Sequence, residues 1–107
     1  MILSNTESVT GYKIVSHCGL AMGNTIRARH VGRDILAVFR MLIGGEITEY
    51  TKMIAESREQ SLDRMKQQAR EMGANAVINI RFTTSAIAAS AAELLAYGTA
   101  VVVEPTE

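Results

Sequence analysis

The chain has 107 residues, of which 48% are hydrophobic, and its eleven Lys and Arg residues balance eleven Asp and Glu residues. This length suits one domain spanning residues 1–107, and the zero net charge provides no field that would attract nucleic acid or an anionic membrane. A single cysteine excludes an internal disulfide and favours a reducing compartment, so we expect a cytoplasmic protein.

The sequence carries no signal for export or for membrane insertion. Residues 1–7 lack the basic segment and the apolar run of a signal peptide. Charged residues such as Arg81 and Glu93 interrupt the apolar stretches before they reach the roughly 20 residues of a spanning helix. With no tryptophan and 5% aromatic residues, the core is expected to consist of Ile, Leu, Val, Ala and Met.

An alternation of apolar and polar residues predicts a strand over residues 12–23. Its more apolar phase is expected to face the core and comprises Tyr12, Ile14, Ser16, Cys18, Leu20 and Met22. Gly19 and Gly23 indicate a bulge or a close approach of another backbone.

Residues 31–45 change to the period of a helix, which Gly44 and Gly45 would end. The apolar stripe comprises Ile35, Val38, Phe39 and Leu42. Leu36, Met41 and Ile43 lie off that stripe, so this helix has more apolar surface than one small sheet covers. Such an excess indicates a subunit interface.

Residues 48–73 predict a second helix, long for so small a domain, with Thr48 as its cap and Gly73 just past its end. The expected apolar stripe comprises Tyr50, Ile54, Ser61, Met65, Ala69 and Met72. Charged pairs such as Asp63 with Lys66 indicate a solvated face on the other side.

Two further strands are predicted over residues 74–84 and 94–104, and the second is apolar in both phases, as in a strand covered on both faces. The residues between them, 85–92, are small and weakly patterned, which favours a flexible hairpin connection. The order strand, helix, helix, strand, strand predicts an α+β fold with a largely antiparallel sheet and one long helix.

The cysteine and both histidines lie close together in sequence, at His17, Cys18 and His30, and are the candidate metal ligands. Adjacent residues of a strand point to opposite faces, so His17 and Cys18 could bind one metal only if the strand bulges there. Structural zinc sites take pairs of ligands at short spacing, which this chain lacks. We therefore expect Cys18 to be a core residue, although a site shared between subunits stays open.

Basic residues gather where the first predicted helix begins, at Arg27, Arg29, His30 and Arg33. A helix N-terminus with added arginines could hold a phosphate or a carboxylate. The alternative is a solvated connection whose arginines pair with Glu46, Glu49 or a neighbouring subunit. Glu46 itself is a candidate ligand residue, whereas Glu49 is explained by its place in the first turn of the long helix.

The sequence contains no P-loop, no GxSxG, no GxGxxG and no pairing of a nucleophile with a base. We therefore expect a protein that is not an enzyme and that needs no cofactor, with a bound metal as an open addition.

Four motifs occur in a characteristic order: Arg33-Asp34, Gly44-Gly45 with Tyr50, residues 73–77 (GANAV) and residues 97–101 (YGTAV). Together they resemble the YbjQ-like family of small bacterial and archaeal proteins, over essentially the whole chain. The resemblance implies a dodecin-like α+β subunit that assembles into a ring, a homopentamer in relatives, and it brings the label of a heavy-metal-binding domain.

Two functions follow as hypotheses. The first is a non-enzymatic, ring-forming binding or scaffold protein, whose partner is a further copy of itself. The second is a binder of a metal or small anion at subunit interfaces, through Arg27, Arg29, His30, Glu46 or His17.

Overall fold

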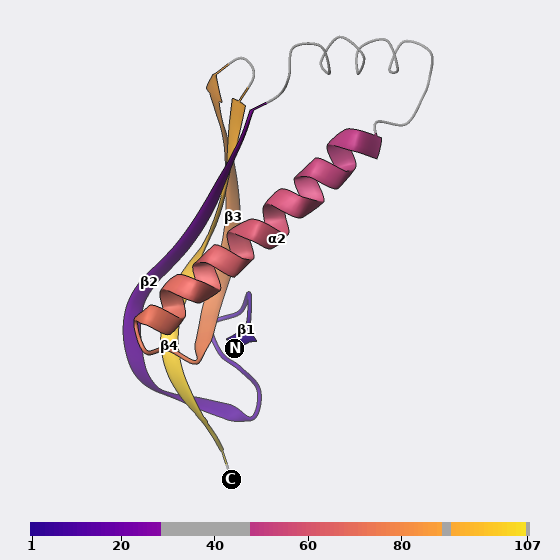
Figure 1. The fold of residues 1–107 in the computed structure, drawn as a ribbon. Coiled ribbons are helices and arrows are strands. Elements are labelled where there is room, and N and C mark those ends of the chain that lie inside the picture. The colour runs from indigo at the N-terminus through magenta and orange to yellow at the C-terminus, as the bar shows by residue number, and fades with distance from the viewer. Residues whose placement is uncertain (29–47, 89–90, 107) are drawn as a thin grey trace.

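The computed structural model describes residues 1–28, 48–88 and 91–106, which form a four-stranded sheet with one helix across it (Figure 1). The elements in chain order are β1 (Ile2–Leu3), β2 (Tyr12–Ala28), α2 (Thr48–Glu71), β3 (Ala76–Ala88) and β4 (Ala91–Pro105). The predicted helix over residues 31–45 lies outside the described residues. The α+β class is confirmed.

The sheet is mixed, with the strand order β1-β3-β4-β2. β4 pairs antiparallel with both β2 and β3, and the two-residue β1 adds a parallel pair to β3. The predicted antiparallel arrangement is therefore correct for the three long strands, whereas β1 was not predicted. Two residues are too short for a pattern of alternation to reveal.

The central position of β4 explains why this strand is apolar in both phases. Ala96 and Ala100 are fully buried in the cluster beneath α2, and Val101 and Val103 belong to a second cluster. Ile2, Val9 and Ile14 pack against that second cluster. Both faces of β4 are thus covered in this region, as predicted.

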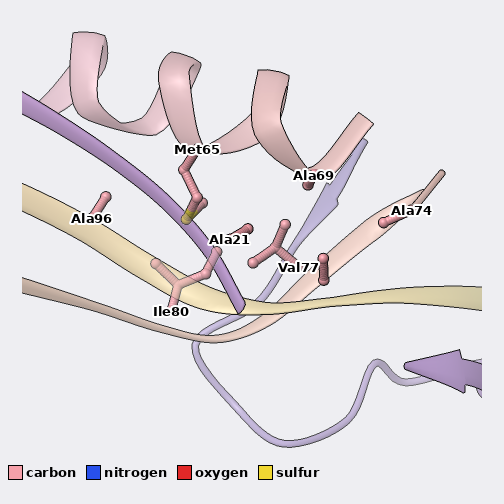
Figure 2. Close-up of a cluster of buried hydrophobic side chains, with 8 residues drawn as sticks. Ala21, Met65, Ala69, Ala74, Val77, Ile80 and Ala96 are labelled. Carbon is pink, nitrogen blue, oxygen red and sulfur yellow. The ribbon is translucent and has the colours of Figure 1, made fainter. Parts of the chain in front are cut away.

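The main core lies between the C-terminal half of α2 and the sheet, and Figure 2 shows Met65 reaching from the helix toward the strands. It consists of Ala21, Met65, Ala69, Ala74, Val77, Ile80, Ala96 and Ala100, with Cys18 and Leu62 packed against it. Four of the five alanines in this set are fully buried, so the helix backbone can approach the strands closely.

The helix α2 is confirmed, but its buried stripe differs from the prediction at both ends. Ser57, Ser61, Met65 and Ala69 are buried at a spacing of four residues. Ile54 and Met72, predicted to be buried, are instead exposed. In Figure 1 the N-terminal end of α2 leans away from the strands.

The end of α2 has the predicted geometry. Gly73 has a φ of 85°, a left-handed conformation that glycine adopts without steric cost. The Ala74 N–H donates to the Ala69 carbonyl at 3.0 Å, and the Gly73 N–H donates to the Arg70 carbonyl at 2.9 Å. These bonds satisfy carbonyls of the last turn that have no partner within the helix.

The predicted hairpin between the last two strands is confirmed, but residues 85–92 are not the flexible connection that was expected. β3 continues to Ala88 and β4 begins at Ala91, so most of this segment is strand. The register pairs Ser85 with Glu93 and Ala86 with Ala92, and Arg27 of β2 also pairs with Ala92. Small residues of low β-propensity are held as strand here because the long neighbouring strands pair with them.

The predicted core phase of β2 holds only in part. Bulges between Ile14 and Ser16 and between His17 and Gly19 each add one residue, so together they leave Leu20 and Met22 on the same face as Ile14. Ile14 packs against the cluster of Val101 and Val103 on that face, whereas Leu20 and Met22 are exposed because no described element covers them. Cys18 is half-buried, as expected. Gly19, with a φ of 125°, confirms the bulge that its presence predicted.

The described part of the chain includes no helix long and apolar enough to cross a membrane.

Candidate functional site

The candidate ligand residues are divided between β2 and the part of the chain outside the described residues. His17 and Cys18 lie in β2, and the backbone of Arg27 forms its penultimate position. Arg29, His30, Arg33 and Glu46 lie outside the described ranges. The predicted basic cluster at the helix entry therefore stays a prediction.

β2 does bulge at the position that the metal hypothesis required. His17 pairs with Val101 and Gly19 pairs with Ala100, so Cys18 is the extra residue. Cys18 is free and half-buried, and it packs against the cluster beneath α2. His17 is exposed. One side chain therefore lies against the core, while its neighbour lies in solvent.

The described residues contain no group of three or more His, Cys, Asp or Glu side chains placed to hold a metal ion. Every buried polar side-chain atom in the described part of the chain has a hydrogen-bond partner. A cation site built from these residues alone would thus have to recruit ligands from another copy of the chain.

A small cluster of hydroxyl groups lies beneath α2, beside the apolar core. The Thr25 hydroxyl donates to the Ser57 carbonyl at 3.4 Å and lies 3.2 Å from Ser61 Oγ. Ser61 Oγ donates to the Leu94 carbonyl of β4 at 3.1 Å. These bonds join the helix to β2 and β4 and leave no hydroxyl of the cluster free for a ligand.

Asn75 bridges two distant segments of the chain. Its Nδ2 donates to the Val103 carbonyl at 2.9 Å, and its Oδ1 accepts from the Val103 N–H at 2.8 Å. The side-chain amide imitates the donor and acceptor pair of a strand residue. Asn75 therefore ties the entry of β3 to β4, and its role is structural.

The outer edge of β2 is occupied by side chains of α2. The Met22 N–H donates to Gln68 Oε1, and the Asn24 carbonyl accepts from Arg64 Nη1. β2 is the last strand of the sheet, so these backbone groups would otherwise be open to pairing with another strand. The helix thus closes the middle of this edge.

The face of the sheet opposite α2 carries a surface that the sequence prediction missed. Cross-strand partners share a face, and the register pairs Leu20 with Thr99, Met22 with Tyr97 and Asn24 with Leu95. We call the apolar part of this surface the outer patch, and its residues are Leu20, Met22, Ile26, Leu95 and Tyr97. The exposed fractions of Leu20, Met22 and Ile26 are 54%, 43% and 61%.

A signal for this surface was present in the sequence. Between the large residues of β2 stand Ala21 and Gly23, which are fully buried or nearly so beneath the helix. A Cβ atom at Gly23 would overlap backbone atoms of Ser61 and Met65. Small residues alternating with large ones mark the face on which a helix lies very close, and the large residues then point the other way.

The chain matches known proteins along its whole length. A family model described as "Putative heavy-metal-binding" matches residues 1–104. A UPF0145 protein of Dehalococcoides mccartyi is 57% identical over 104 residues, which cover 97% of this chain and 100% of the relative. A UPF0145 protein of Thermococcus kodakarensis is 53% identical over 107 residues, covering 100% of this chain and 95% of the relative.

A solved structure shares the fold. A Pediococcus pentosaceus protein of unknown function, assigned to the DUF74 family, superposes with a TM-score of 0.70. The superposition covers 97% of this chain and 98% of the other at 13% sequence identity, so the likeness concerns the fold alone. From the sequence match over residues 1–104, this chain belongs to the YbjQ family, as the order of its motifs indicated.

Proposed function

We propose that this chain is a subunit of a homo-oligomer that acts as a non-enzymatic binding or scaffold protein. The exposed apolar side chains of the described residues carry the proposal: Leu20, Met22 and Ile26 of the outer patch are 54%, 43% and 61% exposed. A contiguous apolar surface of this kind marks a site of association. A further copy of the chain would cover it.

The shape of the chain supports the same proposal. β2 has 17 residues and α2 has 24, so the strand spans roughly 55 Å and the helix roughly 36 Å. Within the described residues, α2 is too short to cover the whole sheet, and a second copy of the chain would provide further cover.

The proposed assembly is a ring of dodecin-like subunits, five in number. This finer statement rests on the resemblance to the YbjQ-like family. The fold shared with the Pediococcus protein is consistent with a subunit of this shape, and it does not show how subunits assemble. Within the same proposal the protein is cytoplasmic, binds no nucleic acid and requires no cofactor.

A second candidate function is the binding of a metal or small anion at subunit interfaces. The bulge at Cys18 and the exposed His17 beside it favour it, together with the description of the family as heavy-metal-binding. A rotation axis that passes close to His17 would bring several copies of this residue together, since each subunit contributes one. Arg27, Arg29, His30 and Glu46 are the further candidates for such a site.

Native mass spectrometry of the untagged protein, with elemental analysis of the same sample, separates the two functions. We expect a multiple of the 11.6 kDa chain mass with no stoichiometric metal. An oligomer that retains one metal per subunit or per ring would favour the second function, and His17→Ala should then release that metal. A single-chain mass would overturn the proposal of a homo-oligomer.

A further inference from the structure

The outer patch is an apolar surface that the described elements leave without cover. Leu20, Met22 and Ile26 follow one another along β2 on the face that turns away from α2. Leu95 and Tyr97 of β4 lie beside them and are half-buried. These five side chains form a continuous strip over two neighbouring strands.

No described element covers this strip. α2 packs on the opposite face, where Ala21, Gly23 and Thr25 meet it. The N-terminal segment packs on the same face as the strip but only farther along β4, where Ile2 and Val9 contact the cluster of Val101 and Val103.

The charges around the strip favour a neutral partner. Its polar neighbours Asn24 and Thr99 are uncharged. Glu93 accepts a hydrogen bond from Asn24 Nδ2 at 3.1 Å, and Arg81 donates to the Asn5 carbonyl at 2.7 Å. Both flanking charges are thus engaged within the chain. A second copy of this chain, which exposes uncharged apolar side chains such as Val15 and Phe82, can meet such a surface without burying a charge.

The edge of β2 offers another route to association, and α2 closes its middle. Gln68 and Arg64 occupy the outward backbone groups of Met22 and Asn24. A strand from another copy could not pair along residues 22–24 without displacing both side chains. The face of the sheet carries no such obstacle.

We propose that the outer patch is the contact surface for a second copy of this chain, which packs on the face of the sheet and not on the edge of β2. The inference rests on the proposed homo-oligomer and names the surface that makes it.

The test compares charge insertion in the outer patch with charge insertion elsewhere. Met22→Lys and Ile26→Lys place an ammonium group in the strip, while Ile54→Lys places one on α2, where the wild-type side chain is 52% exposed. Size-exclusion chromatography with light scattering gives the mass of each variant, and circular dichroism with urea unfolding checks the fold. Since a buried unpaired charge is costly, we expect the two patch variants to fall to the 11.6 kDa chain mass. Ile54→Lys should keep the wild-type mass.

The outcomes distinguish this inference from the proposed homo-oligomer on which it rests. A wild-type protein of single-chain mass would overturn both. A wild-type oligomer whose mass survives in folded Met22→Lys and Ile26→Lys would overturn the outer patch alone. Dissociation of Ile54→Lys to the same extent would also overturn the assignment, because the effect would not be specific to the strip. Should a lysine variant fail to fold, Ile26→Thr removes apolar surface and introduces a residue that favours a strand. If Ile26→Thr keeps the wild-type affinity between subunits, the inference is overturned as well.

Discussion

At the scale of single residues, glycine decides how closely the helix meets the sheet. A Cβ at Gly23 would overlap Ser61 and Met65 backbone atoms of α2, and a Cβ at Gly98 would lie 2.7 Å from Val77 Cγ1 and 2.8 Å from the Ile78 carbonyl oxygen. Neither position has room for a side chain. The absence of a side chain at Gly23 thus allows the backbone of α2 to rest on β2.

We expect Gly23→Ala to lower the free energy of unfolding by about 3 kcal/mol, because overpacking against a backbone cannot be relieved by a change of rotamer. Gly11→Ala is the control: Gly11 has a φ of 84° and no neighbour within 4 Å of the added Cβ, so only backbone strain of about 1 kcal/mol applies. Urea unfolding at one protein concentration measures both. Equal losses in the two variants would contradict the close packing of α2 on Gly23.

At the scale of elements, α2 covers one face of the sheet and also closes the edge of β2. Its buried stripe consists of small residues apart from Met65, and the adjoining positions Arg64 and Gln68 reach over the strand. An exposed strand edge invites pairing with other chains. Two polar side chains at the middle of the longest strand reduce that risk without adding a further strand.

Removal of the Gln68 side chain should loosen this edge locally. In Gln68→Ala the Met22 N–H loses its acceptor, and we expect its amide hydrogen to exchange up to about tenfold faster, since one hydrogen bond contributes roughly 0.5–1.5 kcal/mol. Gln67→Ala is the control, because the Gln67 amide bonds only to Glu71 along the helix surface, at 3.4 Å. NMR exchange rates at Met22 that are unchanged in Gln68→Ala would show that α2 does not hold the edge.

At the scale of the whole molecule, the described residues form a core with few large side chains. Apart from Met65, Val77 and Ile80, the cluster beneath α2 consists of alanines, and large hydrophobic side chains such as Leu20, Ile26 and Phe82 are exposed. Covering exposed apolar surface by association adds hydrophobic free energy to the stability of the fold. Association is therefore expected to stabilise this chain.

If association contributes to stability in this way, the unfolding midpoint depends on protein concentration. We expect wild-type stability to rise by about 1.4 kcal/mol for each tenfold increase in concentration, once dissociation accompanies unfolding. Met22→Lys, expected to be a monomer, should show no such dependence. Thermal unfolding followed over a hundredfold concentration range measures the effect, and a constant wild-type midpoint would indicate a chain that is stable on its own.

Much of the candidate site lay beyond sequence reasoning for physical reasons. The alternation correctly places Leu20 and Met22 on the same face of β2 as Ile14, but it does not show which face α2 covers. Leu20 and Met22 were therefore assigned to the core, although α2 lies on the opposite face. The bridge from Asn75 to Val103 spans 28 residues, so it depends on a strand pairing that local patterns do not specify.

The sequence by itself determined the elements whose causes are local. The periodicity of residues 48–71 and the glycine at position 73 specify a helix and its end, and the two apolar phases of residues 94–104 specify a central strand. The motif order specified the family. Tertiary structure decided the rest, because pairing with long neighbours holds the small residues 85–88 and 91–92 in strands, and the close approach of α2 to Gly23 determines which face of β2 is left open. Local preference is weak wherever contacts between distant residues contribute more free energy, and in this chain those contacts create the outer patch.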